Sequence, residues 1–451
     1  MTSAPDPSTA AEVPHCLPIV RSTNVWTGRR WRSADLKFAT DGRVERIADY
    51  GSLPGFVHDH GDLLVMPGLV DPHVHFNQPG RTEWEGIASG SAAARAGGIT
   101  TVVDMPLNSS PVTTTAEAID RKRKCIEAES VVDMGMHFGL IPENAQRIDG
   151  EWIRDTVSVK AFLCPSGIDE FPPVQRSDLF EAMPRIRDAG KILMVHAEVV
   201  SEAAPMSDPR SAKGYSATRP PKFEGDAIEM MIELVKSTEC PVHVVHLADA
   251  QSLPQLRAAR DAGLPISVET CPHYLIFDHD TIPDGATEFK CAPPIRDSRN
   301  RDELWNGLID GTIDMIVSDH SPCPPSMKHR DRGRFDLAWG GIASIQLGFS
   351  AVWTEASRRE IPVERVWQWM SAAPAQLIGG SSELAVGRRA NLLVFDPALK
   401  WFVDASDLLH RHSVTPYHRR VMTGKVIETY VGGRKKPDPQ HAKFIRGVAE
   451  A

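Results

Sequence analysis

The tripeptide His73-Val74-His75 places two imidazoles at alternate positions in an apolar run that extends over residues 68–76. Side chains at alternate positions of a β-strand point to the same side, so both rings could bind one metal ion. Taken alone, the pair is explained equally well by chance or by two hydrogen-bonded core histidines. The pair therefore predicts a metal site only if further ligands gather beside it.

Four more residues with ligand chemistry lie in or at the ends of other strand-like runs. They are Lys160, His196, His246 and Asp319. A single histidine at a strand end is more often a hydrogen-bonded structural residue than a ligand. In a parallel βα barrel, however, the carboxyl ends of all strands meet at one rim, where active groups collect. We therefore expect these residues to surround one site together with the histidine pair.

Lys160 lies in the apolar run 157–163, which is an unfavourable place for an ammonium group unless it is paired or neutral. Burial makes an amine neutral and nucleophilic, and such an amine can add carbon dioxide to become a carbamate. The alternative is an ordinary lysine paired with a carboxylate. We favour the carbamate, an anionic oxygen ligand able to bridge two ions, because four histidines and one aspartate supply too little negative charge for two divalent metal ions.

The elements that must position these residues alternate between short β-rich runs and longer segments of helical period, as in a TIM-like (β/α)8 barrel. The predicted strands cover residues 68–76, 99–105, 133–140, 157–163, 192–197, 242–247, 266–270 and 313–319. The predicted outer helices cover residues 85–96, 115–128, 226–236 and 250–262.

Short alternating runs with turn residues between them occur near both ends of the chain. They predict one small composite β-sandwich domain, built from residues 17–65 together with residues 381–435, beside an α/β barrel domain of residues 66–380. Residues 1–16 are expected to form a disordered N-terminal tail and residues 436–451 a C-terminal tail.

The composition of the whole chain favours a small-molecule ligand. A formal net charge of -9 over 451 residues argues against nucleic acid or an anionic membrane surface as partner. No apolar stretch is long enough to span a bilayer. The seven cysteines are widely spaced and form no CxxC pair, which argues against a disulfide framework and favours a reducing, cytoplasmic location.

The six candidate ligands resemble the binuclear metal site of the amidohydrolase superfamily, and the resemblance covers about residues 17–433. Further motifs are similar to those of the allantoinase family. They are Pro79-Gly80-Arg81, Trp84-Glu85-Gly86, Asp104-Met105-Pro106-Leu107-Asn108, Glu269-Thr270-Cys271-Pro272-His273-Tyr274, Lys290-Cys291-Ala292-Pro293-Pro294 and Ser318-Asp319-His320-Ser321-Pro322-Cys323-Pro324-Pro325. Dihydroorotases usually carry an arginine where this chain has Asn77, and dihydropyrimidinases carry a tyrosine where it has Cys164-Pro165-Ser166.

The resemblance implies that His73, His75 and Asp319 bind one divalent ion and that His196 and His246 bind the second. Carbon dioxide would convert Lys160 to N6-carboxylysine, which would bridge the two ions. Zinc is expected, with cobalt, manganese or nickel as alternatives. A metal-activated hydroxide would open the cyclic amide of allantoin to give allantoate, a step of purine catabolism, while Asp319 carries the proton to the leaving nitrogen.

The same resemblance implies substrate contacts from the backbone of Cys291 and Gly340 and from the side chains of Ser321 and Asn108. Cys291 is explained equally well as a small buried thiol. A homotetramer is expected by resemblance. Two alternatives remain, namely ring opening of the hydantoinase or dihydropyrimidinase type and a non-catalytic scaffold, and the filled ligand positions count against the scaffold.

Overall fold

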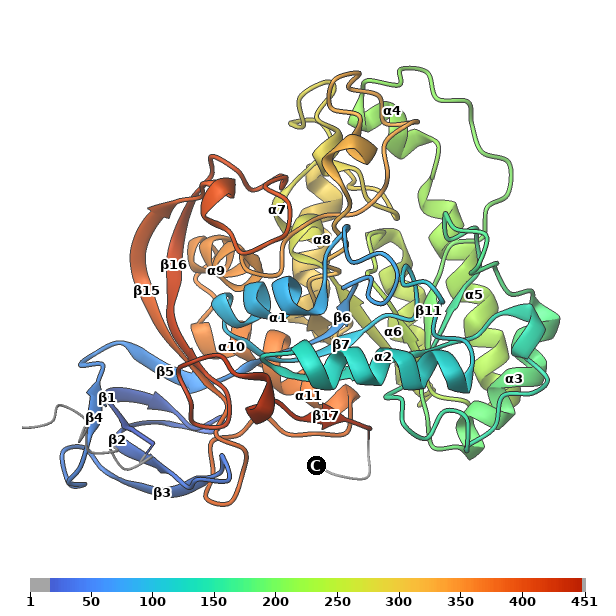
Figure 1. Cartoon of the computed structure of the whole chain (residues 1–451). Coiled ribbons are helices and arrows are strands. Elements are labelled where there is room, and N and C mark those ends of the chain that lie inside the picture. Colours follow the sequence, from blue (N-terminus) through green and yellow to red (C-terminus); the bar gives the residue numbers. More distant parts are fainter. Residues whose placement is uncertain (1–16, 448–451) are drawn as a thin grey trace, which may run out of the picture.

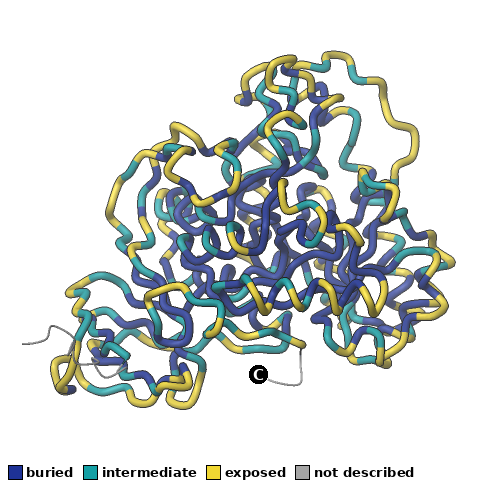
Figure 2. Tube along the Cα trace, viewed as in Figure 1, coloured by how far each residue is buried: buried dark blue, intermediate teal, exposed yellow. Residues whose placement is uncertain are grey.

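The computed structural model describes residues 17–447 (Figure 1). The predicted N-terminal tail, residues 1–16, lies outside the described residues, as do residues 448–451. Buried segments concentrate in the middle of the larger body, and exposed segments lie on its outer helices and loops (Figure 2). The chain therefore builds its main core around the inner strands.

Parallel strands form the wall of a barrel. Within residues 17–447, one sheet has the order β14-β13-β12-β11-β10-β9 and another the order β17-β8-β7-β6. β8 and β9 are consecutive pieces of one strand, and a parallel bridge from Val74 to His320 closes the ring. The structure confirms the predicted TIM-like barrel. Its strands are β6 (Leu69–Val74), β7 (Ile99–Asp104), β8 (Asp133–Met136), β9 (Phe138–Gly139), β10 (Val159–Phe162), β11 (Leu193–His196), β12 (Val242–Val244), β13 (Ile266–Thr270), β14 (Met315–Ile316) and β17 (Phe444–Ile445).

Two barrel strands end three residues earlier than the sequence predicts. β12 stops at Val244 and β14 stops at Ile316, whereas the predicted runs reach residues 247 and 319. His246 and Asp319 lie just beyond, and both have left-handed backbone, with φ of 40° and 41°. A left-handed residue interrupts the alternation of a strand and turns the chain. Both side chains are therefore oriented by a turn and not by the strand pleat.

Helices surround the barrel and pack their apolar sides against it (Figure 1). Thr115 begins α2 by accepting a hydrogen bond from the amide of Ala118, and Asp297 begins α8 by accepting one from Asn300. The helices are α1 (Ile87–Ala96), α2 (Ala116–Glu129), α3 (Arg176–Asp188), α4 (Ala212–Ala217), α5 (Pro221–Thr238), α6 (Leu253–Asp261), α7 (Pro272–Ile276), α8 (Ser298–Ile309), α9 (Gly348–Arg358), α10 (Val363–Trp367) and α11 (Ala373–Leu377).

The smaller body joins strands from both ends of the described chain. Its sheet has the order β16-β15-β5-β1-β2-β3, and β4 pairs with β1. Side chains from both halves of this sheet, among them Leu36 and Leu392, share one buried cluster, so the halves pack face to face as in a sandwich. The strands are β1 (Ile19–Trp26), β2 (Trp31–Phe38), β3 (Val44–Asp49), β4 (Val57–Asp59), β5 (Leu64–Pro67), β15 (Leu392–Phe402) and β16 (Val421–Tyr430).

The chain passes directly from the smaller body into the barrel. Only Gly68 separates β5 of the smaller body from β6 of the barrel. The exact limits at residues 65 and 380 therefore stay predictions. Beyond the predicted limit at residue 435, β17 pairs in parallel with β8, so two residues of the predicted C-terminal tail form a short added strand at the barrel.

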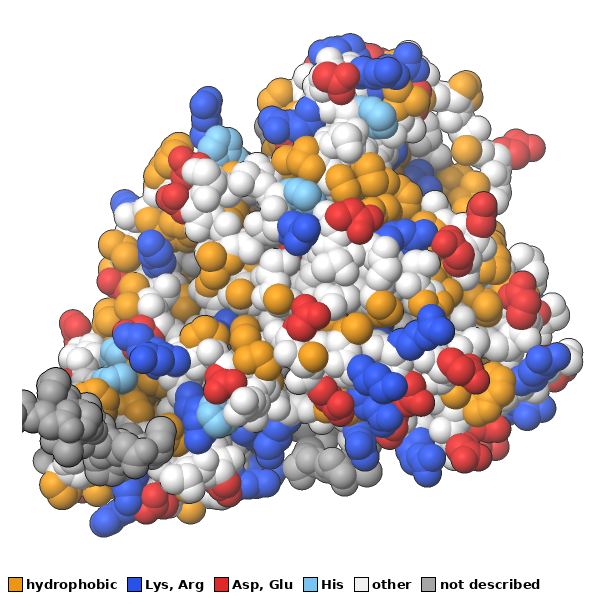
Figure 3. All heavy atoms as spheres, in the orientation of Figure 1, with side chains coloured by type: hydrophobic (Ala, Val, Ile, Leu, Met, Phe, Trp, Pro, Cys, Tyr) orange, Lys and Arg blue, Asp and Glu red, His pale blue; other side chains and the backbone are white. Residues whose placement is uncertain are grey.

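The visible surface is mixed in charge. Basic and acidic side chains intermingle over the face shown in Figure 3, with small apolar areas between them. Among the described helices, none combines the length and the apolar character needed to cross a membrane.

Candidate metal centre and active site

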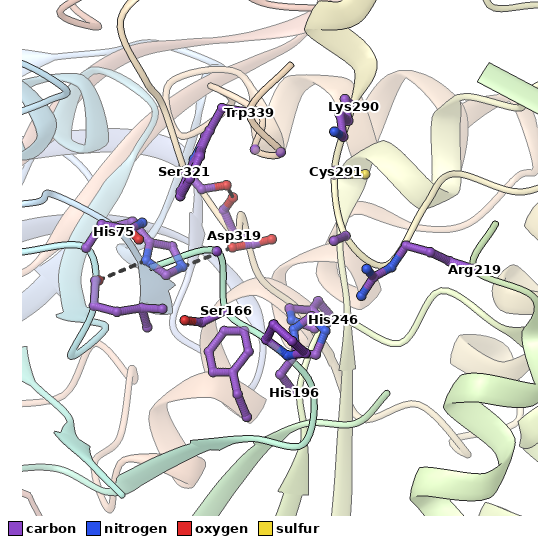
Figure 4. A pocket seen from close by; sticks show the side chains of 18 of the residues that line it. His75, Ser166, His196, Arg219, His246, Lys290, Cys291, Asp319, Ser321 and Trp339 are labelled. Carbon is purple, nitrogen blue, oxygen red and sulfur yellow. Dashed lines mark hydrogen bonds and ion pairs between the residues drawn. The ribbon is translucent and has the colours of Figure 1, made fainter. Parts of the chain in front are cut away.

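A cavity of about 300 Å³ opens at the carboxyl ends of the barrel strands (Figure 4). This is the rim where barrel proteins collect active groups. The residues that line it include His73, His75, His196, His246 and Asp319. The structure thus brings five of the six predicted ligands to one cavity, from strands and turns that lie far apart in the sequence.

The first group of predicted ligands consists of the histidine pair and the aspartate. Asp319 Oδ1 lies 3.2 Å from His73 Nε2 and 3.4 Å from His75 Nε2. One ligand atom from each of the three residues lies within 4.8 Å of the others, and all three residues are buried. Two imidazoles and a carboxylate at this spacing form a donor set that suits a divalent transition-metal ion.

The second group adjoins the first. The ring centroids of His196 and His246 are 4.6 Å apart, and those of His246 and His73 are 5.4 Å apart. His196 Nε2 donates to the Glu198 carboxylate at 2.7 Å, which leaves Nδ1 as the nitrogen for a metal ion. His246 Nδ1 is buried without a hydrogen-bond partner in the described structure. The four imidazoles therefore form one continuous cluster.

Lys160 is the sixth predicted ligand. Its side chain is 1% exposed in the barrel interior, and its Nζ has no hydrogen-bond partner within the described residues. Nζ lies 4.9 Å from the centre of the Phe162 ring. Burial lowers the pKa of Lys160 to about 7, although the charges of Glu269 and Asp319 act in the opposite direction. The unpartnered amine is thus partly neutral near pH 7 and chemically free to react.

Two buried carboxylates whose role the sequence motifs do not indicate hold the histidines of the predicted ligand set. Glu269, on β13, accepts hydrogen bonds from His73 Nδ1 at 2.5 Å and from His243 Nε2 at 2.9 Å. It also accepts one from the backbone amide of His246. A carboxylate behind a ligand histidine fixes the tautomer and the orientation of the ring. The signal available in the sequence was an acidic residue next to the last residue of a buried strand.

Glu198 plays the same part for His196. Besides His196 Nε2, it contacts the Arg219 guanidinium, whose Nε donates to Glu198 Oε1 at 3.0 Å. Burial alone would raise the pKa of Glu198. The hydrogen bond from His196 and the charge of Arg219 outweigh burial and lower this pKa to about 2. The carboxylate is therefore ionised and keeps His196 in place.

The field in the first group favours a cation. Burial alone would lower the pKa of His73, but the facing carboxylates of Glu269 and Asp319 raise it to about 9. Burial raises the pKa of Asp319, yet the charge of His73 and hydrogen bonds from both histidines hold it well below its usual range. A site that attracts a proton this strongly also attracts a metal cation. The donor atoms, their burial and this field fit a divalent metal ion.

The predicted substrate contacts also line the cavity. They are Asn108, Cys291, Ser321 and Gly340. The Cys291 carbonyl accepts a hydrogen bond from Tyr215 Oη at 3.0 Å, and Ser321 Oγ donates to the Asp319 carbonyl at 2.9 Å.

Several further lining residues were not predicted. Among them are Tyr215, Arg219, Lys290 and Trp339, and Figure 4 labels the last three around the cavity. Nothing in the spacing of these residues along the chain marks them as neighbours of the ligands. The cavity wall is therefore more basic and more aromatic than the sequence motifs indicate.

The fold and the site together define a metal-dependent hydrolase of the barrel type. Residues 64–435 match the sequence profile of the Amidohydrolase family. The chain is 41% identical over 424 residues to "Allantoinase" of Streptomyces avermitilis, covering 92% of this chain and 94% of that protein. It is 40% identical over 426 residues to "Probable allantoinase" of Oryza sativa subsp. japonica, covering 89% and 84%. The chain belongs to the amidohydrolase family and, within it, to the allantoinases.

Solved structures agree with this fold. The "L-Hydantoinase (Dihydropyrimidinase) from Arthrobacter aurescens" superposes with a TM-score of 0.86, covers 95% of this chain and 99% of its own, and is 26% identical. A "D-hydantoinase" structure, 22% identical with a TM-score of 0.84, shares the fold.

Proposed function

We propose that this protein hydrolyses the cyclic amide of allantoin to give allantoate. The observation that carries the proposal is the convergence of His73, His75 and Asp319 in one buried cavity, beside two further histidines, in a chain about 40% identical to proteins named allantoinase. Spontaneous hydrolysis of an amide is slow because its carbonyl is a poor electrophile and its nitrogen a poor leaving group. The residues of this site can overcome both obstacles.

We assign one divalent ion to His73, His75 and Asp319 and a second to His196 and His246, with Lys160 as an N6-carboxylysine bridge. Bound there, the two ions would lower the pKa of a water molecule and polarise the amide carbonyl. The lowered pKa and the unpartnered amine of Lys160 support its reaction with carbon dioxide. We take zinc as the ion, with cobalt, manganese and nickel as alternatives, because imidazole and carboxylate suit all four.

The proton has a carrier in Asp319. Its carboxylate lies beside the histidine pair and is ionised, the form in which a carboxylate takes up a proton, and we assign to it the proton of the attacking water. Returned to the ring nitrogen, the same proton lets that nitrogen leave as a neutral group. The ring amide would be held by backbone groups of Cys291 and Gly340, with Ser321 and Asn108 beside it.

A substrate panel tests the proposal. Protein loaded with zinc and bicarbonate should hydrolyse allantoin with a kcat/KM at least about tenfold above that for hydantoin, dihydrouracil or dihydroorotate. Asp319→Asn serves as the control for contaminating hydrolases and should lose activity by at least about 100-fold.

The panel also decides between the candidates. The likeness to hydantoinase structures makes hydantoin ring opening the second candidate, and a preference for hydantoin or dihydrouracil would establish it over the first. No turnover of any ring, combined with no bound metal, would leave a non-catalytic scaffold.

Assembly and location are proposals as well. We propose a homotetramer in the cytoplasm, on the resemblance to the family and on the six free cysteines of the described chain, which suit a reducing compartment. Light scattering of the purified protein measures the assembly. A monomer or dimer at working concentration would contradict it.

A further inference from the structure

A lysine ammonium is buried beside the substrate cavity without a counter-ion. Lys328 is the last residue of a short 3-10 helix, η4 (Pro325–Lys328), and its side chain is 3% exposed. Among the described residues, no carboxylate lies within ion-pairing distance of it. Burial lowers the pKa of Lys328. Burying an unpaired cation is unfavourable, so this position requires an explanation.

Backbone carbonyls surround the ammonium instead. Lys328 Nζ donates to the Trp339 carbonyl at 2.9 Å, to the Gly341 carbonyl, and more weakly to the Lys290 carbonyl at 3.5 Å. The three oxygens use the three N–H bonds of the ammonium group. They come from two segments that are about fifty residues apart in the sequence.

The two segments carry the backbone groups assigned to the ring amide. Cys291 follows Lys290, and Gly340 lies between the other two carbonyls. The Gly341 amide also donates to the Lys290 carbonyl at 2.8 Å. Three carbonyls that face one point repel one another unless a cation lies between them. The hydrogen bond between Gly341 and Lys290 joins the two segments directly, and the ammonium strengthens this contact by offsetting the repulsion among the three carbonyl dipoles.

We propose that Lys328 is a positioning residue, an internal cation that fixes residues 339–341 against residues 290–291 and so sets the spacing of the backbone groups that bind the ring amide. This inference rests on the proposed function. Among the described residues, Lys328 does not line the cavity, and its ammonium contacts only the backbone carbonyls named above. Since ring binding occurs before and during the reaction, the loss of this spacing raises KM more than it lowers kcat.

The test uses the metal-loaded enzyme. Lys328→Met keeps most of the side-chain volume but removes the charge, and it should raise KM for allantoin by about tenfold or more with kcat within about threefold. Hydrogen exchange of the Gly341 amide should accelerate in the same variant, and the metal content should not change. Lys222→Met is the control, because Lys222 is exposed and, within residues 17–447, pairs only with Asp226 on α5. It should leave KM and exchange unchanged.

Rescue separates a cation requirement from general damage. Lys328→Ala should regain low KM and slow exchange when propylammonium is added, whereas propanol of similar size should not restore them. If Lys328→Met does not fold, Lys328→Ala is produced with propylammonium and measured before and after dialysis. Unchanged KM and exchange in a folded neutral variant would overturn the proposal, as would equal rescue by propanol. If the native enzyme does not hydrolyse allantoin, the proposed function is wrong. Hydrogen exchange of the Gly341 amide still tests whether Lys328 holds the two segments together.

Discussion

At the scale of single residues, Lys160 is the most unusual group in the site. It combines nearly complete burial, a pKa of about 7 and an amine with no hydrogen-bond partner among the described residues. A permanently charged lysine in such surroundings would have a carboxylate or several hydrogen-bond acceptors beside its ammonium group. The amine is instead left in a state where it can lose its proton and become a ligand.

The pH dependence of reactivation follows from that pKa. Because the pKa of Lys160 is lowered to about 7, its neutral fraction rises as the pH rises through 7 and is nearly complete above it. Metal-free protein mixed with zinc at a fixed concentration of dissolved carbon dioxide should regain activity roughly tenfold faster at pH 8 than at pH 6, with little further gain. An ordinary lysine would still gain above pH 9.

Removing the side chain of Lys160 tests whether its amine supplies the bridging carboxylate. Lys160→Ala should bind little metal, and added propionate should restore part of its activity by supplying a carboxylate at the same place. Restoration should show no rise with pH between about 6 and 8, since propionate is already ionised there. An unmodified lysine in a metal-loaded, active crystal would contradict the carbamate.

At the scale of elements, the ligands depend on contacts between neighbouring strands. The carboxylate of Glu269 on β13 accepts hydrogen bonds from His243 on β12 and from His73 on β6, so it connects three strands. The same carboxylate accepts the amide of His246, where the left-handed turn begins. The turn beyond β12 and the first ligand pair are therefore set by one buried side chain.

Replacing that carboxylate tests the element contacts. Glu269→Gln keeps the shape but removes the charge, so His73 loses its orienting partner, and metal affinity or activity should fall by about 10- to 100-fold. Metal titration of the purified variant measures this. Glu233→Gln, in an exposed ion pair with Arg176 between outer helices, should behave as the native protein does. Native-like affinity in Glu269→Gln would show that His73 needs no such partner.

At the scale of the whole molecule, Asp133 joins the smaller body to the barrel. It is a barrel residue on β8, and its carboxylate pairs with Arg389 at 2.8 Å and accepts a hydrogen bond from Asn391 at 2.8 Å. The backbone amide of Lys443 donates to it as well, next to β17. One buried carboxylate thus connects three parts of the chain, and it lies away from the cavity.

Replacing Asp133 should lower the stability of the protein and leave its catalytic rate unchanged. Asp133→Asn leaves the partly buried Arg389 without its counter-ion, which should cost about 3 kcal/mol and lower Tm by roughly 3 °C or more. The kcat of the folded variant should equal that of the native protein. Asp49→Asn, whose side chain is 94% exposed beside Arg32, should change Tm by less than about 1 °C. An equal Tm for both variants would remove Asp133 as a connection between the bodies.

The sequence by itself determined the class of the fold and predicted the set of residues that the structure brings to one cavity. Alternation along a strand put His73 and His75 on one side, and the rule that barrel strands end at a common rim connected them to Lys160, His196 and Asp319. These are inferences from local pattern and fold class. They needed no knowledge of which residues far apart in the chain touch one another.

Only the tertiary structure decided how those ligands are held. Glu269, Glu198 and Lys328 look like ordinary charged residues in the sequence, because each has at least one partner more than twenty residues away along the chain. The left-handed turns at His246 and Asp319 were missed for the same reason, since the apolar runs continue past the true strand ends. Local pattern reports the period of an element, whereas burial, charge pairing and turn geometry arise only when the elements pack.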